Sequence, residues 1–374
     1  MSHIPFIEAR FFDPAETRYT LEERFKCFLL DLRAGRLRPK RAIAEELADT
    51  DGDDDDLPSF EVDPLVIHKL GGPDESRIRR RVARILEGRK AASGLDHLKK
   101  DDRERLEVLR DGVRLITISS EHRADELAAE LHAEMPWMAP ATEIVWRVMR
   151  RSVREGWPGL RVPPLLLDGP PGIGKSHWAR RLGEVIGAPT TVIEATGENA
   201  SFGVVGSQRG WGGSHPGRVL ETILQTRIAN PVMVIDEVEK AGRAVSTKGH
   251  AFGLAEALLP LLEPLTARRW SCPYYQVRFD MSRVIWVLTS NDCRLLPEPL
   301  LSRCPPVRLR HLTRAELTDF VRREGVKRAL SEAAVEAIAG VLAHPSLRDQ
   351  RPSLRIAARM LQRAADLQNA PLLH

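Results

Sequence analysis

Apolar residues recur with the period of a helix along the first part of the chain. Four polar segments show this spacing, at 21–34, 41–48, 75–90 and 97–109. In the third segment, five arginines surround one apolar stripe made of Ile78, Val82, Ile85 and Leu86. We therefore expect a mainly helical region over residues 1–135.

The pattern changes after this region. Residues 112–118 favour a short strand and residues 123–134 a helix, and Pro136 and Pro140 then interrupt the chain. Thr142 can cap a helix that carries Ile144, Val145, Val148 and Met149. We place the start of the next domain at about residue 141.

Continuous apolar runs then predict the strands of a buried parallel sheet. They span residues 165–167, 232–235 and 284–288, and polar residues follow each run. Parallel strands that are covered by helices on both faces have such runs, and α/β proteins bind ligands beyond the carboxyl ends of these strands. We expect an α/β domain with a parallel sheet flanked by helices over residues 141–310, and a small helical lid over residues 311–374.

Composition and charge change this picture little. The 374 residues include 56 basic and 52 acidic side chains, and the formal charge of +4 is weak support for a nucleic-acid partner. The four cysteines fit no metal-binding spacing, so we interpret them as reduced thiols. No signal peptide opens the chain, and no apolar run reaches the ~18 residues of a membrane span. We expect a cytoplasmic protein with no membrane partner.

An acidic run at residues 49–56 has only a superficial likeness to a calcium-binding loop. When Asp49 is counted as the first position, the sixth is not glycine and the twelfth is not glutamate. We interpret this run as a solvated linker.

Residues 169–176 have the G-x-x-x-x-G-K-[ST] spacing of a phosphate-binding loop, and they lie between an apolar run and a helical pattern. Gly172 and Gly174 can adopt backbone angles that are closed to other residues, so that successive N–H groups face a phosphate. Lys175 would reach the β- and γ-phosphates, and the Ser176 hydroxyl would ligate Mg²⁺. The expected ATP-binding residues are Gly169, Pro170, Pro171, Gly172, Ile173, Gly174, Lys175, Ser176 and His177.

Two further strand ends predict the chemistry at that phosphate. The run at 232–235 leads to Asp236, which would hold Mg²⁺, and to Glu237, which would polarise the attacking water. The run at 284–288 leads to Asn291, which can hydrogen-bond the γ-phosphate or the water. An ordinary core strand with an acidic end and a turn-forming asparagine are the alternatives. We expect Mg²⁺-dependent hydrolysis of ATP.

These features together resemble the AAA+ superfamily, and within it the ATPase module of Lon-type proteins. The resemblance covers residues 165–359 and rests on further segments that occur in the same order, at 209–218, 230–231, 239–242, 279–282 and 297–303. It implies a homo-oligomeric ring, a hexamer by analogy with the family. Arg303 matches the arginine finger of the family, which would reach the nucleotide of a neighbouring subunit; a surface arginine with local ion pairs is the alternative.

The resemblance also implies roles for three other residues. Trp211 matches the pore-loop aromatic that grips a polypeptide, although Gly212 replaces the usual apolar neighbour, and a tryptophan packed beneath a loop stays open. Arg355 matches the sensor-2 arginine, which contacts the nucleotide phosphate of its own subunit. Arg351 competes for this role because the usual Gly-x-Arg pattern is absent, and a structural Arg355 is the other alternative.

The function expected from the resemblance is a ring-forming remodeller of polypeptides, acting on a polypeptide substrate or with an effector protein. Lon proteins continue into a peptidase domain with a Ser/Lys dyad, which is not recognisable in these 374 residues, so we expect no peptidase activity. The alternative function is an ATP-controlled switch or a nucleic-acid-associated ATPase that acts through the arginine-rich segment 79–84.

Overall fold

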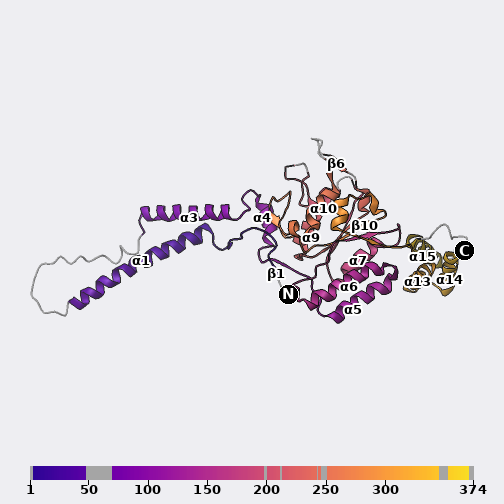
Figure 1. Ribbon diagram of the computed structural model, residues 1–374. Helices are drawn as coiled ribbons and strands as arrows, with labels where there is room; N and C mark the ends of the chain where they lie inside the picture. The colour runs from indigo at the N-terminus through magenta and orange to yellow at the C-terminus, as the bar shows by residue number, and fades with distance from the viewer. Residues whose placement is uncertain are drawn as a thin grey trace, which may run out of the picture. The chain divides into compact units, whose positions relative to one another are not determined.

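The computed structural model describes residues 3–47, 70–197, 200–210, 213–241, 243–245, 251–344 and 353–369 (Figure 1). The acidic run at 49–56, Trp211 and Arg351 lie outside the described residues. Internal contacts divide the chain into two compact units. Ala9–Arg103 form one unit, and Met1–Glu8 together with Glu104–His374 form the other.

A five-stranded parallel sheet forms the centre of the larger unit. Its strands, in spatial order, are β11 (Pro306–Arg308), β3 (Leu165–Asp168), β10 (Ile285–Ser290), β5 (Val232–Asp236) and β4 (Thr190–Glu194). The three apolar runs of the sequence are the three central strands. The register pairs Ser290 with Asp168 and Leu288 with Ile235, so these strands end at one edge of the sheet. The polar residues that follow them meet at that edge, and the predicted α/β fold is confirmed.

Helices cover both faces of the sheet. Figure 1 shows α5 (Glu121–Glu134), α6 (Ala139–Arg154) and α7 (Lys175–Ile186) on one face, and α9 (Arg218–Thr226) and α10 (Leu254–Leu262) on the other. On the first face, alternate strand residues such as Leu165, Leu167 and Val234 pack against Leu131, Val145 and Leu182 of these helices. The residues between them, such as Leu166 and Met233, are also fully buried. Burial on both faces explains why the runs at 165–167, 232–235 and 284–288 contain no polar residue.

The last three described helices form a small unit with its own core, which we call the lid. They are α13 (Arg314–Lys327), α14 (Glu332–Ala343) and α15 (Leu354–Gln368), and they pack around Leu317, Val321, Ile338 and Leu361. A capping box starts α13, because the Thr313 side chain accepts from the Glu316 N–H and the Glu316 carboxylate accepts from the Thr313 N–H. The pKa of Glu316 is lowered to about 2, chiefly by its hydrogen bond with Arg310.

Residues near the start of the sequence pack into the larger unit. Strand β1 (His3–Ile4) pairs antiparallel with β2 (Val113–Arg114), and Ile7 forms a bridge with Phe279. The buried ring of Phe6 lies 5.6 Å from that of Phe279, and Glu8 forms an ion pair with Arg269. The contacts therefore divide the chain differently from the boundaries at 135 and 141 expected from the sequence, because residues 3–8 and 104–135 share contacts with the sheet-containing unit.

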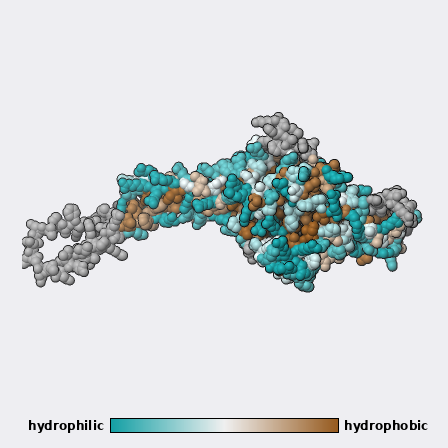
Figure 2. All heavy atoms as spheres, in the orientation of Figure 1, coloured by the Kyte–Doolittle hydropathy of each residue, from teal (hydrophilic) through white to brown (hydrophobic). Residues whose placement is uncertain are grey.

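The smaller unit contains two packed helices, α1 (Arg18–Leu47) and α3 (Gly72–Ala92). Helix α1 spans both of the first two predicted segments, so the break expected between residues 34 and 41 is wrong. Leu21 of α1 packs against Ile78 and Val82 of α3, and this confirms the apolar stripe seen in the sequence. Figure 2 shows hydrophilic residues over most of the visible surface of these helices, with apolar patches between them.

The remaining elements are short. They are α4 (Lys100–Glu107), η1 (Pro136–Met138), α8 (Ala200–Val205), η2 (Val238–Lys240), β6 (Arg243–Val245), β7 (Ala251–Gly253), α11 (Pro264–Ala267), β8 (Trp270–Ser271), β9 (Arg278–Phe279), η3 (Cys293–Leu295) and α12 (Glu298–Arg303). Among the described residues, no helix is both long and apolar enough to cross a membrane.

Candidate active site

The phosphate-binding loop connects the end of β3 to the start of α7. Gly172 has a φ of +75° and Gly174 a φ of +93°, both in the left-handed region that favours glycine. A side chain at Gly172 would collide with Ser353, because its Cβ would lie 2.7 Å from the Ser353 Cβ. The backbone N–H of Leu354 donates to the Gly172 carbonyl at 3.1 Å. The loop therefore needs glycine both for its backbone angles and for its close contact with the start of lid helix α15.

Lys175, the first residue of α7, is buried within this loop. Its ammonium donates to the carbonyl oxygens of Gly169 at 2.7 Å and Pro170 at 2.9 Å, and to the side-chain oxygen of Asn291 at 3.0 Å. Burial lowers the pKa of Lys175, and the nearby carboxylates, with Glu239 the strongest, oppose this shift. Lys175 thus holds a cationic group against the loop, in the place where an anionic phosphate would be stabilised.

A hydroxyl and carboxylate pair lies beside Lys175. The Ser176 hydroxyl donates to Asp236 Oδ1 at 2.5 Å, and the Thr289 hydroxyl donates to the same oxygen at 2.6 Å. No group of three or more His, Cys, Asp or Glu side chains that could hold a metal occurs in the described ranges. The pair nevertheless fits Mg²⁺, because this ion is usually held by few protein oxygens, with waters and substrate phosphates as its other ligands.

Glu237 and Asn291 face each other across the ends of β5 and β10. Asn291 Nδ2 donates to Glu239 Oε1 at 2.9 Å and to Glu237 Oε1 at 3.3 Å, while Glu237 Oε2 accepts from Lys240 at 2.8 Å. Glu239 Oε1 also accepts the Asn291 backbone N–H at 3.1 Å, which fixes the start of this loop. Asn291 therefore connects the carboxylate of Glu237 to the ammonium of Lys175.

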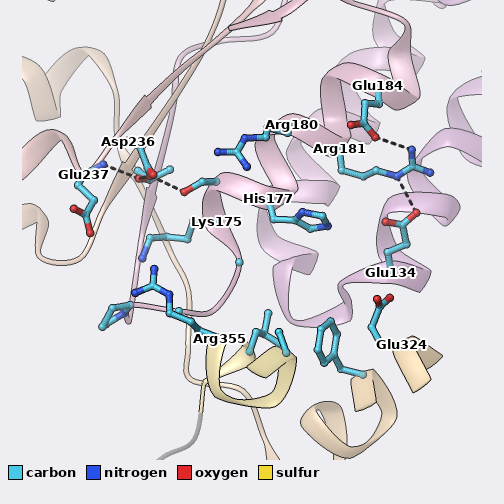
Figure 3. Close-up of a pocket in the computed structure, with 18 of the residues that line it drawn as sticks. Glu134, Lys175, His177, Arg180, Arg181, Glu184, Asp236, Glu237, Glu324 and Arg355 are labelled. Atoms are coloured by element: carbon cyan, nitrogen blue, oxygen red, sulfur yellow. Dashed lines mark hydrogen bonds and ion pairs between the residues drawn. The ribbon is translucent and has the colours of Figure 1, made fainter. Parts of the chain in front are cut away.

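These groups line one cavity of about 860 Å³, which Figure 3 shows between the sheet edge and the lid. His177 and Arg180 line it from α7, and the Arg181 guanidinium is held between Glu134 and Glu184. Arg355 extends from α15 on the side of Lys175 (Figure 3). The cavity thus combines backbone amides of a glycine loop, the cationic side chains of Lys175, Arg180 and Arg355, and a carboxylate next to a hydroxyl. Together these groups suit the phosphates of a nucleotide.

Comparison with known proteins agrees with this geometry. Residues 165–311 match the family described as ATPase family associated with various cellular activities (AAA). These residues form an AAA-family ATPase domain. The resemblance to AAA+ proteins seen in the sequence is therefore confirmed, and the domain binds nucleotide.

The relatives of this chain include Lon proteases. Peroxisomal Lon protease homolog 2 of Arabidopsis thaliana is 30% identical over 294 residues, which are 78% of this chain and 32% of that protein. Lon protease 2 of Thermus thermophilus is 32% identical over 174 residues, 46% of this chain and 21% of that protein. Lon protease of Mycoplasma pneumoniae is 30% identical over 177 residues, 47% of this chain and 22% of that protein. The chain thus spans about a third or less of the length of these relatives.

In the AAA domain, Arg303 lies apart from the nucleotide cavity. It ends α12, which precedes β11, whereas the phosphate-binding loop follows the parallel strand β3. Arg303 donates to the Pro299 carbonyl at 3.1 Å, and its Nε lies 3.8 Å from Glu263. Because it belongs to the opposite edge of the sheet, Arg303 does not line the cavity of its own chain.

The AAA site also contains residues that the sequence did not single out. Thr289 contacts both acidic residues, since its hydroxyl donates to Asp236 and accepts the Glu237 N–H at 3.0 Å. Glu239 orients Asn291, and Arg180 lines the cavity. Because Thr289 stands at the polar end of the third apolar run, the sequence indicates that it lies near the sheet edge. The sequence does not show that its hydroxyl faces Asp236 and Glu237 of the neighbouring strand.

Proposed function

We propose that this chain hydrolyses ATP with Mg²⁺ and uses the reaction to remodel polypeptides within a ring of identical copies. The observation that supports hydrolysis is the arrangement of Lys175, Ser176, Asp236, Glu237 and Asn291 around one cavity. Lys175 would bind the β- and γ-phosphates, and Ser176 and Asp236 would hold Mg²⁺, which would neutralise the phosphate charge and orient the substrate. Glu237 would accept a proton from the attacking water.

In the structure, Glu237 is tied to Lys240 and Asn291. Both contacts orient the Glu237 carboxylate at the end of β5, beside Asp236. Asn291 would exchange its contact with Lys175 for one with the γ-phosphate or the water once Lys175 turns to the phosphate. Arg355 would add a second cation from the lid.

The Glu237→Gln variant tests hydrolysis. The amide keeps the size and the hydrogen bonding of the side chain but cannot accept the proton, so we expect steady-state phosphate release to fall by at least about a hundredfold. ATP binding, measured by calorimetry, should stay close to that of the unchanged protein. Glu336→Gln, the same replacement at an exposed lid residue paired with Arg322, is the matched control. Undiminished turnover in Glu237→Gln would disprove the assignment.

The position of Arg303 supports the ring. It lies at the sheet edge opposite the nucleotide cavity, so an arginine finger could reach a nucleotide only from another copy. Residues 209–218 resemble the Lon pore loop, and the names of the relatives describe proteases, which act on polypeptides. We do not extend peptide cleavage to this chain, because it matches only 32% of the Arabidopsis relative.

Complementation between two inactive variants tests the ring. Lys175→Ala should fail to bind ATP, and Arg303→Ala should bind ATP but not hydrolyse it. In a mixed ring, an Arg303→Ala subunit can receive the intact Arg303 of a Lys175→Ala neighbour, so the mixture should regain turnover that neither variant has alone. Full turnover by Arg303→Ala alone, or no recovery on mixing, would argue against the shared site.

The contacts of the arginine-rich helix α3 do not favour a second candidate function, such as nucleic-acid binding. Arg81 lies over the ring of Phe25 at 5.2 Å, and Arg79 pairs with Glu75. These contacts suit a structural role within the two-helix unit.

A further inference from the structure

A second cavity, of about 910 Å³, lies at the sheet edge opposite the nucleotide site. Its walls come from residues that precede the strands: Pro163 and Pro164 before β3, Arg283 and Val284 before β10, and Arg303 before β11. The nucleotide cavity is built from residues that follow β3, β5 and β10. The two cavities therefore share no residue and are separated by the length of the strands.

The lining of this second cavity is strongly basic. Four arginines line it, Arg151, Arg161, Arg283 and Arg303, against a single acidic residue, Glu263. Arg151 pairs with Glu155 at 2.7 Å and lies over the ring of Trp157. The guanidinium groups of Arg161 and Arg283 have no hydrogen bond or ion pair within the described part of the chain. The cavity thus has a net positive charge that its own residues do not balance.

Three buried donors at this cavity also have no acceptor among the described residues. They are the Nε atoms of Arg283 and Arg303 and the indole Nε1 of Trp286, a side chain that is only 1% exposed. Of the three, Arg303 Nε lies 3.8 Å from the Glu263 carboxylate, an ion pair without a hydrogen bond. The indoles of two other buried tryptophans are satisfied, since Trp137 donates to Ile173 and Trp178 to Thr142. A buried donor without a partner is unfavourable, so an acceptor that reached these donors from the cavity would be stabilised there.

The rest of the wall is apolar and restricts the ligand further. Val148, Val162, Leu261 and Leu262 line the same space as the arginines. A cavity of this size whose walls combine an apolar surface with convergent polar groups suits a small organic molecule that has both kinds of group. An inorganic ion would satisfy the donors but leave the apolar wall in contact with water.

We propose that this cavity binds a small organic anion, a phosphate or carboxylate group joined to an apolar body. The anion accepts hydrogen bonds from Arg283, Trp286 and Arg303, and the apolar body packs on Leu261, Leu262 and Val162. The anion could come from a free metabolite or from the nucleotide phosphates of a neighbouring copy. Both sources are considered because Arg303, the proposed arginine finger, also lines this cavity. The free ligand fits the apolar wall better. This site goes beyond the proposed ATPase function and does not depend on it.

Calorimetry with 1-naphthyl phosphate tests the site on the full chain, with the nucleotide cavity filled by saturating ADP. We expect saturable binding that weakens at least tenfold in Arg283→Gln and in Trp286→Phe, which keeps an aromatic ring but removes the N–H donor. Arg322→Gln, at an exposed lid arginine, should bind like the unchanged protein. Thermal melting checks that each variant is folded. Uncharged 1-naphthol should bind at least tenfold more weakly than the phosphate.

Two results would overturn the site: no saturable binding to the unchanged, ADP-bound chain, or equal affinity in all three variants. A second arm distinguishes the sources of the anion. Naphthyl phosphate is titrated into Glu237→Gln with ATP, at concentrations where copies associate. Retained binding supports a free ligand, whereas displacement on association supports the phosphates of a neighbouring nucleotide. Phosphate release by the unchanged protein is measured separately, so failure of the ATPase assignment leaves this result interpretable.

Discussion

The backbone conformation of Glu237 points the adjacent carboxylates of Asp236 and Glu237 at different partners. Its φ of +55° is rare for a residue with a side chain, and its N–H is held by the Thr289 hydroxyl at 3.0 Å. This turn directs Asp236 to Ser176 and Glu237 to Asn291. Strain at a site is retained when surrounding contacts enforce it, and here Thr289 is that contact.

The sequence predicted the residues of this site better than their contacts. The phosphate-binding loop was recognisable because its function depends on neighbouring residues along the chain. Thr289 and Glu239 were missed because their roles depend on contacts across more than fifty positions, which no local pattern encodes. The arginine at 303 was expected from the resemblance, but only the strand order shows that it belongs to the opposite edge.

Thiol labelling tests burial at the scale of single residues. Burial raises the pKa of Cys272 to about 11 and of Cys304 to about 12, and it also raises the pKa of Cys293. These thiols stay protonated at pH 8 and should be unreactive, whereas Cys27 is exposed. A disulfide reagent should therefore modify one thiol per native chain at pH 8 and four after denaturation.

Alkaline pH should make the three buried thiols more reactive. Their folded pKa values lie above the 9.0 of an unperturbed cysteine, so their contribution to stability is present below pH 9 and is lost as the pH rises towards 11 and 12. Slow labelling of Cys272, Cys293 and Cys304 should accelerate in that range. A Cys27→Ser control should show no fast label, and rapid reaction of a second thiol at pH 8 would contradict the burial.

At the scale of elements, hydrogen bonds from helices α15 and α13 attach the lid to the core in the described part of the chain. Leu354 at the start of α15 donates to the phosphate-binding loop, as described above. In α13, the Arg323 guanidinium donates to the Ala133 carbonyl and, at 2.6 Å, to that of Glu134. Those are terminal carbonyls of α5, which lack helical partners and favour a cation. No periodicity links α13 to α5, so the sequence does not predict this attachment.

Loss of Arg323 should loosen the lid. A pair of charge-assisted hydrogen bonds is worth about 1.4 kcal/mol or more, so Arg323→Ala should release ADP about tenfold faster. Stopped-flow displacement of a fluorescent ADP analogue measures this rate. Arg322→Ala is the matched control, because this neighbouring arginine pairs with Glu336 within the lid. Equal release rates in the two variants would show that the Arg323 contact does not hold the lid.

At the scale of the whole molecule, the two-helix unit is an insertion into the ATPase unit. Residues 9–103 make their own compact set of contacts, while the segments before and after them belong together. The backbone N–H of Arg10 donates to the Ser93 carbonyl at 3.0 Å, so residues 11–92 of this unit leave and return at adjacent points. The sequence showed the helices of this region but not its insertion, because the pairing of β1 with β2 joins short segments that lack an apolar pattern.

Excision of the insertion should leave the ATPase unit intact. Joining Arg10 to Ser93 through a short Gly-Ser linker bridges ends that already touch, and every residue that lines the nucleotide cavity lies outside the deleted segment. We expect a cooperative thermal transition and an ADP affinity within about threefold of the full chain. A shortened chain that is unfolded, or that binds ADP tenfold more weakly, would show that the insertion supports the site.

The pairing of the first residues with much later ones also determines when the protein can finish folding on the ribosome. Residues 3–8 are synthesised long before residue 279, yet Phe6 and Ile7 can pack only when Phe279 is present. The inserted helices need only contacts among residues 9–103, so they can form during this interval. Until translation has passed residue 279, Phe6 lacks the residue on which it packs and stays exposed to solvent and to chaperones. Residues 3–8 are therefore buried late, although they are made early.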